Sequence, residues 1–256
     1  MLDSLLTNTS AWLLVFARMG GLLGMNPLFS RRNVPAMVRV GLTLLMTVLI
    51  APGIDAPALG TSSFGLATGL LQELLVGLAC GFVFQIFYYM LFFAGDLMDT
   101  QFGLSMAKVF DPGTNVQLSI SGTLLNLLFI LYIFVTDSYL LLIRIFAASF
   151  QILPAGSVHF SPEAAQFFLS LFISVFSMVL RLALPFIAAE FVLELAMGIL
   201  MKLIPQIHVF VINIQFKVLL GMVLLLAFAG PIASFIDNYM RIMFDSLQSV
   251  FYAMGA

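Results

Sequence analysis

The chain has 256 residues, of which 62% are hydrophobic and only 9% are charged, and its formal net charge is -2. A soluble domain carries about 25% charged residues, so this composition excludes an ordinary soluble domain and indicates a membrane protein. The net charge gives no indication of nucleic-acid binding, which requires a basic patch. A single cysteine, Cys80, excludes an internal disulfide and most thiolate metal sites.

The first two apolar runs cover residues 5–25 and 38–51, and Arg18 lies inside the first. The chain between and just after them carries three arginines, Arg31, Arg32 and Arg39. Under the positive-inside rule this loop is expected to be cytoplasmic, which places the N-terminus outside. No Lys or Arg precedes the first apolar run, so a cleavable signal peptide is not expected.

The third apolar run, residues 66–94, is preceded and crossed by a stripe of small residues at every fourth position. Its members are Gly65, Gly69, Glu73, Gly77 and Gly81. Small residues at this spacing allow another helix backbone to approach closely, so the stripe predicts a helix-packing seam. Glu73 lies in the same stripe, either pairing with a basic neighbour or serving as a functional carboxylate.

A long polar stretch, residues 95–121, follows the third run. Inside it is a small apolar group, Met106, Val109 and Phe110, just before the turn residues Asp111-Pro112-Gly113. A loop of this length inside a compact apolar protein is typically either functional or disordered.

Two short apolar helices are predicted at residues 118–135 and 138–153. The turn between them, Thr136-Asp137-Ser138, has polar side chains suited to capping the second helix. Each helix is short for a span of about 20 residues. The pair is therefore either re-entrant or covered by other subunits, and Arg144 inside the second helix needs a partner.

A further helix over residues 163–184 is expected to close at Arg181 and Pro185, and another then runs toward Pro205. The helix after Pro185 carries a stripe at every fourth residue, Glu190, Glu194, Gly198 and Lys202. Each charged group facing lipid would cost about 2.5 to 3.5 kcal/mol, so the stripe must face protein or water.

Residues 209–230 form the next apolar helix, with Lys217 inside it and a break at Pro231. Residues 232–254 are amphipathic, which indicates a helix at a surface or on a partner.

No catalytic residue, cofactor site or metal site is predicted. His159 and His208 stand alone in the sequence, and Asp96 and Asp99 are spaced as in a loop or helix end. The charges within apolar runs are Arg18, Glu73, Arg144, Arg181, Glu190, Glu194, Lys202 and Lys217. Either they pair between the helices of one assembly, or they mark the pathway of a stand-alone transporter. The chain lacks the repeated pair of broken helices that many transporters have.

Four groups of residues, taken in their order, resemble the FliR family of flagellar export-gate proteins and its relatives in virulence type III secretion. They are Arg18 with Pro27 and Pro35; Glu73, Gly77 and Gly81; Gln101, Gly103 and Phe110-Asp111-Pro112; and Ala183-Leu184-Pro185 followed by Lys202-Leu203-Ile204-Pro205-Gln206 and Phe210. The resemblance covers nearly the whole chain. One departure is the turn at residues 136–138, where an Asn-Gly-His-like sequence would be expected.

The resemblance implies an all-α, polytopic membrane protein with short hairpins and proline-broken helices, embedded in a helical hetero-oligomeric pore complex. Residues 1–256 would form a single export-gate domain, in which 1–184 is similar to the P-type subunit. Residues 185–256 would supply a Q-type-like helical hairpin and a C-terminal helix. Members are non-enzymatic and need no cofactor.

The resemblance also implies binding partners and a cellular location. The partners would be the P-type and Q-type export-gate subunits, the switch protein, the large export-gate subunit, membrane lipid, and exported flagellar subunits as substrates. The place would be the flagellar basal body in the bacterial inner membrane. The loop at residues 105–115 would be the pore plug, with Met106, Val109, Phe110, Asp111 and Pro112. An apolar constriction of this kind excludes water and ions.

Overall fold

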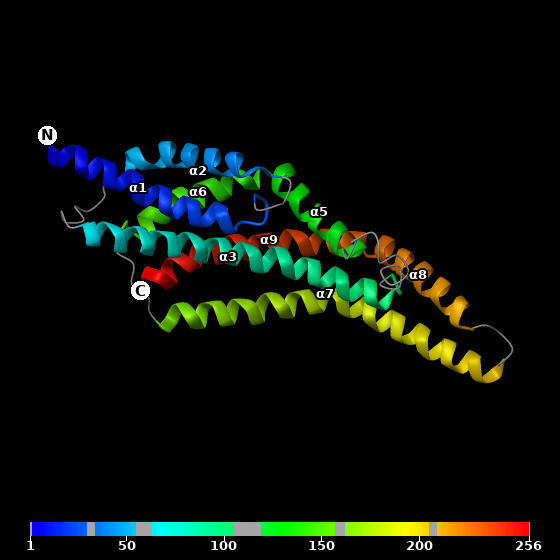
Figure 1. Cartoon of the computed structure of the whole chain (residues 1–256). Helices are drawn as coiled ribbons and strands as arrows, with labels where there is room; N and C mark the ends of the chain where they lie inside the picture. The colour runs from blue at the N-terminus through cyan, green and yellow to red at the C-terminus, as the bar shows by residue number, and fades with distance from the viewer. Residues whose placement is uncertain are drawn as a thin grey trace. The chain divides into compact units, whose positions relative to one another are not determined.

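A computed structural model describes residues 2–29, 34–54, 63–104, 119–156, 162–204 and 209–255. Every regular element in these ranges is a helix, so the all-α prediction is confirmed (Figure 1). The elements are α1 (Leu2–Met25), α2 (Ala36–Ile50), the short 3-10 helix η1 (Ala51–Gly53), α3 (Ser63–Gln101), α5 (Ile120–Val135), α6 (Ser138–Ile152), α7 (Pro162–Leu203), α8 (Val209–Ala227) and α9 (Ala229–Gly255).

Three helical segments among the described residues are long and apolar enough to cross a membrane: Ala36–Gly53, Phe64–Gln101 and Glu163–Leu203. Two further pairs of helices pass the same test together but are bent, α5 with α6 by 77° and α8 with α9 by 62°. Each bent pair is a broken span or a re-entrant loop by this criterion. The prediction of a polytopic membrane protein is therefore confirmed.

The bend between α5 and α6 occurs at Asp137, which has a left-handed backbone with φ of 53°. Asp and Asn tolerate this conformation better than most residues. The Asp137 side chain makes no capping hydrogen bond to α6. The predicted role of this turn in capping the second helix is thus wrong for Asp137, which supplies the bend instead.

The third helix is longer than predicted, because α3 continues through the start of the polar stretch to Gln101. Gly95 does not end it, since the helix is held there by contact with α5. A Cβ atom added at Gly95 would lie 2.0 Å from the backbone nitrogen of Gly122. The prediction of a loop from residue 95 is therefore wrong for residues 95–101, where packing outweighs the weak helix propensity of glycine.

The predicted break at Pro185 is also wrong, because α7 runs through it without interruption. Proline removes one backbone donor, but neighbouring helices can make up for this in an apolar setting. Phe186 is fully buried, with ring centroids 6.0 Å from Phe102 and 5.3 Å from Phe228. These aromatic contacts fix α7 directly after Pro185.

The break near Pro231 falls slightly earlier than predicted, between Ala227 and Ala229. The proline ring clashes with the carbonyl four residues before it, which is that of Ala227. The helix therefore ends at Ala227, and Pro231 lies in the first turn of α9, where its missing N–H costs little.

The chain forms two compact units, each assembled from separate stretches. Unit 1 comprises Met1–Phe87, Asp137–Phe172 and Arg241–Ala256, and unit 2 comprises Tyr88–Thr136 and Ile173–Met240. The core of unit 1 includes Leu14, Val15, Met19, Val83, Phe84, Ile145, Phe146, Met243, Leu247 and Phe251, and that of unit 2 includes Leu91, Met98, Phe102, Leu125, Phe129, Phe186 and Tyr239. The predicted division at residue 184 falls inside α7 and stays a prediction.

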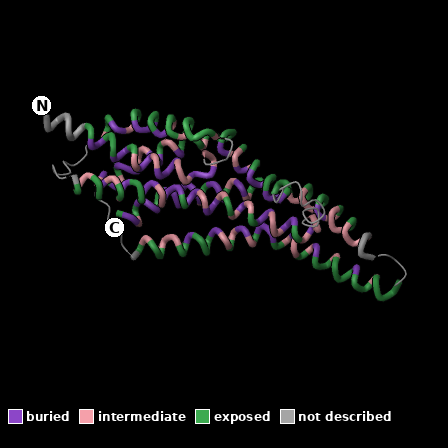
Figure 2. Tube along the Cα trace, viewed as in Figure 1, coloured by how far each residue is buried: buried purple, intermediate pink, exposed green. Residues whose placement is uncertain are grey.

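Within unit 1, α2 is exposed along most of its length (Figure 2), whereas residues 241–255 of α9 bury one face. Met243, Leu247 and Phe251 are fully buried there, whereas Arg241, Asp245 and Gln248 are exposed. The amphipathic pattern predicted for this helix therefore matches the face that it buries against its own chain.

Candidate functional site

The segment proposed as a plug from the resemblance, residues 105–115, lies outside the described residues. The same holds for its members Met106, Val109, Phe110, Asp111 and Pro112. The chain on either side of residues 105–118 is described, and both sides belong to unit 2. These two described ends, the last turn of α3 and the first turn of α5, are called the loop base.

Asp99 connects the two sides of the loop base. Its carboxylate is 1% exposed and accepts hydrogen bonds from the Ser119 hydroxyl at 2.7 Å, the Ile120 backbone N–H at 2.6 Å and the Ser121 backbone N–H at 3.2 Å. The first N–H groups of a helix have no partner within the helix, and a negative charge is favourable there. Asp99 thus caps α5 from the last turn of α3. Ser119 adds a second cap, because its hydroxyl oxygen accepts from the Gly122 N–H at 2.8 Å.

The end of α3 is also fixed to α7 and α8. The buried Phe102 ring lies so close to α8 that a Cβ atom added at Gly221 would be 2.5 Å from a ring carbon. Directly after it, Gly103 has φ of 73°, which most L-residues avoid. Gly103 therefore lets the chain leave the helix while Phe102 stays in place.

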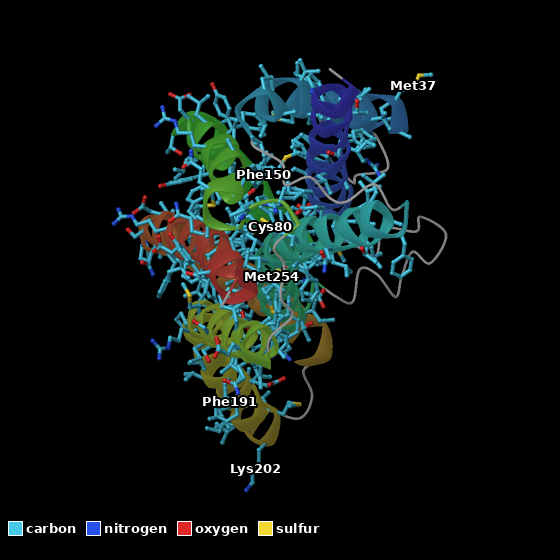
Figure 3. All side chains as sticks on the ribbon, turned by 90° about the vertical axis from the view of Figure 1, so that its left-hand side faces the viewer. Met37, Cys80, Phe150, Phe191, Lys202 and Met254 are labelled. Atoms are coloured by element: carbon cyan, nitrogen blue, oxygen red, sulfur yellow. The ribbon has the colours of Figure 1, made fainter. Side chains whose placement is uncertain are left out.

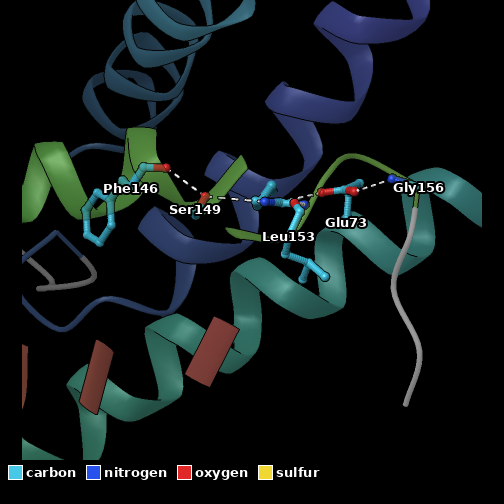
Figure 4. Close-up of polar contacts among 6 residues, drawn as sticks. Glu73, Phe146, Ser149, Leu153 and Gly156 are labelled. Carbon is cyan, nitrogen blue, oxygen red and sulfur yellow. Dashed lines mark hydrogen bonds and ion pairs between the residues drawn. The ribbon is translucent and has the colours of Figure 1, made fainter. Parts of the chain in front are cut away.

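A second polar site lies inside unit 1, around Arg18 and Glu73 (Figure 4). Both side chains are fully buried, and the Arg18 Nε donates to a Glu73 carboxylate oxygen at 2.5 Å. The other Arg18 nitrogens donate to the Ser149 hydroxyl at 3.3 Å and the Leu153 carbonyl at 3.0 Å. The second Glu73 oxygen accepts from the Gly156 N–H at 2.9 Å. One ion pair thereby joins α1, α3, α6 and the turn after α6. Glu73 was expected either to pair with a basic neighbour or to serve as a functional carboxylate, and the structure shows it paired with Arg18.

The small-residue stripe continues this contact along α1. A Cβ atom at Gly77 would lie 2.0 Å from the Arg18 carbonyl oxygen, and one at Gly81 would lie 2.8 Å from the Met25 Cβ. Of the remaining members, Gly69 is buried and Gly65 is half-buried. The seam thus brings α3 against α1 of the same chain, with the Arg18–Glu73 pair in it.

The charged residues of α7 and α8 form a looser group in unit 2. The Lys217 Nζ lies 2.9 Å from a Glu194 carboxylate oxygen, and the Glu194 side chain is 58% exposed. Glu190, one turn before Glu194, is 1% exposed, and neither of its carboxylate oxygens has a hydrogen-bond partner among the described residues. Lys202 is exposed, and Figure 3 shows its side chain pointing away from the ribbon. The described residues therefore supply an ion-pair partner for Glu194 but no hydrogen-bond partner for Glu190.

Among the residues that the structure describes, no three His, Cys, Asp or Glu side chains come together as a metal site requires.

Comparison with known proteins decides the family. The family model described as bacterial export proteins, family 1, matches residues 9–243. The chain belongs to this family. A flagellar biosynthetic protein FliR from Escherichia coli is 30% identical over 91% of the chain and 89% of its own length. The FliR of Bacillus subtilis is 26% identical over 99% of both chains, and the Yop proteins translocation protein T of Yersinia pestis is 26% identical over 83% of this chain and 82% of its own. The resemblance to the FliR family is therefore confirmed.

The structure places the family motif residues only in part. Pro185 lies inside α7, whereas Pro205 and Gln206 lie outside the described residues. Four of the charges predicted to pair in the assembly, Arg144, Arg181, Glu194 and Lys202, are exposed in this chain. The helix faces that carry them are not covered by the described helices of this chain. Their pairing with another subunit stays a prediction.

The cap that Asp99 provides could be predicted only in part from the sequence. The signal for half of it was present, since Ser119 directly precedes an apolar run and serine is a preferred N-cap residue. The other half depends on a carboxylate 20 residues earlier in the chain, and no spacing rule indicates that contact.

Proposed function

We propose that this chain is a non-enzymatic subunit of a flagellar type III protein export gate, in which it forms the entrance pore for unfolded flagellar proteins with P-type and Q-type subunits. The observation that carries the proposal is the similarity to FliR proteins over 91% and 99% of the chain. The proposed site is the basal body in the bacterial inner membrane. The switch protein and the large export-gate subunit are the further proposed partners.

Exposed apolar helix faces support an assembly of several chains. The helix α5 has 16 residues, which at about 1.5 Å each is about 24 Å and less than a hydrocarbon core of about 30 Å. It nevertheless exposes large apolar side chains, among them Ile120, Leu127, Phe134 and Val135. A helix too short to span alone, with such a face, is well suited to being covered by neighbouring subunits.

The exposed charges support the same proposal against the alternative of a stand-alone transporter. A transporter would enclose the charged stripe of α7 around a pathway within one chain. Of its three charged members only Glu190 is buried, whereas Glu194 and Lys202 are exposed. A charged side chain is costly against lipid, so these groups favour contacts with other subunits.

For the pore itself, we propose that residues 105–115 act as its plug, through Met106, Val109, Phe110, Asp111 and Pro112. Burying one large apolar side chain contributes about 1.5 to 3 kcal/mol, which an arriving substrate can overcome. The loop base supports this, because Asp99, Phe102 and Ser119 fix the described chain on either side of residues 105–118. Closure would then depend on the segment and not on movement of α3 or α5.

The decisive experiment is purification of the affinity-tagged chain from cells that also express the P-type and Q-type subunits. The proposal predicts one monodisperse particle that contains all three proteins. A matched purification from cells without the two subunits should yield a less stable or aggregated chain. A chain that is monodisperse alone, retains neither subunit and transports a solute in vesicles would support the transporter instead.

A further inference from the structure

Unit 2 carries a group of two carboxylates and one ammonium on α7 and α8, formed by Glu190, Glu194 and Lys217. The group therefore has one negative charge more than it has positive charges. We infer that Glu194 is the docking point for an arginine side chain of a neighbouring subunit, and that docking moves the Lys217 ammonium from Glu194 to Glu190. The inference rests on the proposed assembly of several chains and is independent of the proposed plug.

The single chain leaves the buried carboxylate of the group without a cation. Glu190 is 1% exposed and neither of its oxygens has a hydrogen-bond partner, whereas the Lys217 Nζ lies 2.9 Å from a Glu194 oxygen. Lys202 is exposed, lies eight residues after Glu194, or about 12 Å along the helix, and points away from the ribbon (Figure 3). The group thus lacks a second cation among the described residues, and an assembly of several chains can supply it.

Lys217 is placed to pair with either carboxylate. Glu190 and Glu194 are one helical turn apart, and the Cβ atoms of residues at this spacing are about 5–6 Å apart. The Lys217 ammonium also interacts electrostatically with Glu190, and it ends a flexible stem of four carbons. Only 14% of the Lys217 side chain is exposed, so its stem already lies inside the unit. A change of rotamer is therefore sufficient to move the ammonium one turn along α7.

Hydration explains why the ammonium stays at Glu194 in the single chain. The Glu194 side chain is 58% exposed, so this ion pair keeps part of its water, whereas pairing with Glu190 would bury the ammonium. A neighbouring subunit that covers Glu194 removes this water and brings its own cation. Lys217 is then buried at either carboxylate, and a buried carboxylate without a partner is costly. Docking therefore favours Lys217 at Glu190 and the arginine at Glu194.

The surface around Glu194 suits a protein partner. Its exposed apolar neighbours on α7 are Phe191, Leu195 and Ile199, which are 59%, 54% and 63% exposed. Gly198, one turn after Glu194, is exposed, and a Cβ atom added there would meet nothing within 4 Å. A side chain of another subunit can therefore approach the carboxylate over Gly198. Arginine is enriched in interfaces and lysine is depleted, and a guanidinium can donate two parallel hydrogen bonds to one carboxylate.

The first test compares the single chain with the complex that is co-purified with the P-type and Q-type subunits. Dicyclohexylcarbodiimide, an apolar reagent, joins a carboxylate to a nearby lysine through an amide bond, and mass spectrometry locates the link. In the single chain, Lys217 should be linked mainly to Glu194. In the complex, the ratio of Lys217–Glu190 links to Lys217–Glu194 links should rise about tenfold.

Glu194→Gln gives an independent measurement, because it removes the charge with which the arginine pairs. Recovery of the complex should fall about tenfold. Glu163→Gln is the matched control, the same change at another exposed carboxylate of α7, and it should leave recovery within about twofold.

Three outcomes would overturn the inference while the proposed function stands. The wild type assembles but the ratio of links does not change, or Glu194→Gln and Glu163→Gln are recovered equally. In the third, the ratio rises in vesicles of phosphatidylethanolamine without the other subunits, which would assign the contact to the ammonium of a lipid. A wild-type chain that retains neither subunit would contradict the proposed function, and the inference with it.

Discussion

The two units each bury a glutamate, but in opposite ways. Glu73 in unit 1 is fully buried, and both of its carboxylate oxygens accept hydrogen bonds, from Arg18 and from the Gly156 N–H. Glu190 in unit 2 is buried to nearly the same degree, and neither oxygen has a hydrogen-bond partner among the described residues. A buried charge without a partner is costly. Glu73 is therefore explained by this chain alone, whereas Glu190 is not.

The difference separates two kinds of charged residue in an apolar protein. Around Glu73, one guanidinium supplies three donors to three segments of chain, so the site holds unit 1 together. Around Glu190, the nearest pairing is the exposed Lys217–Glu194 contact, and exposed pairs contribute only about 0–1 kcal/mol.

Arg18→Leu should give the largest effect. It leaves the Glu73 carboxylate buried without its cation, and breaking a buried ion pair in this way costs about 3–5 kcal/mol. Thermal unfolding of the purified chain in detergent would measure the loss. The control is Arg144→Leu, the same change at an exposed position, with an expected effect within about 0.5 kcal/mol. Equal melting temperatures for the two variants would show that the buried pair does not stabilise unit 1.

Gly77→Leu should be the next most damaging change. Its Cβ atom alone would meet the Arg18 carbonyl oxygen at 2.0 Å, so α1 must move away from α3. Overpacking costs about 1–3 kcal/mol and more where backbone must shift, and recovery of the assembled complex should fall strongly. Gly41→Leu is the matched control in the same unit, because an added Cβ there meets nothing within 4 Å. Normal recovery and motility with Gly77→Leu would mean that the stripe is not a packing seam.

Asp99→Ala should have a moderate effect at the loop base. It leaves the backbone N–H groups of Ile120 and Ser121 without their acceptor, at a cost of about 1–3 kcal/mol. Hydrogen exchange at the start of α5 should accelerate, whereas exchange in α1 should not change. Thr100→Ala is the control, since that residue is exposed and its hydroxyl donates to the Asp96 carbonyl of its own helix. Similar exchange in the two variants would argue against the cap.

The two buried glutamates are compared most directly by Glu73→Gln and Glu190→Gln. The effect of Glu190→Gln on stability should be the smallest of all the variants. Loss of charge at Glu73 removes an ion pair and should destabilise the chain. Loss of charge at Glu190 removes an uncompensated buried carboxylate, so stability should stay the same or rise by about 1 kcal/mol. Both are measured by unfolding in detergent at neutral pH. If Glu190→Gln destabilised the chain as much as Glu73→Gln, Glu190 would have a partner within the chain.

The sequence allowed much of the fold to be predicted, because apolar runs of helical length are strong signals. The errors came where neighbouring helices decide the local structure. Pro185 was expected to end a helix, but aromatic contacts of Phe186 keep α7 continuous. Gly95 was expected to begin a loop, but its contact with Gly122 keeps α3 helical. Propensity at a single residue cannot include such contacts.

The charged residues could be recognised from sequence, but not their partners. Arg18 and Glu73 are 55 positions apart, and Asp99 and Ser119 are 20 apart. Such pairs depend on how the helices pack, which periodicity does not determine. For the same reason the sequence could not show that Arg144 and Arg181 are exposed in this chain whereas Arg18 is buried.

The most direct test of the proposed pore is deletion of residues 105–115 in cells that assemble the complete complex. Because an apolar seal excludes ions by dewetting, its removal should let ions and small solutes leak while export continues. Phe110→Ala alone should leak less, since in the proposed plug Met106 and Val109 would still occlude the path. The measurement is membrane conductance, with assembly verified by co-purification. A deletion that assembles normally and leaks ions supports the account, and one that assembles normally but stays as tight as the wild type contradicts it.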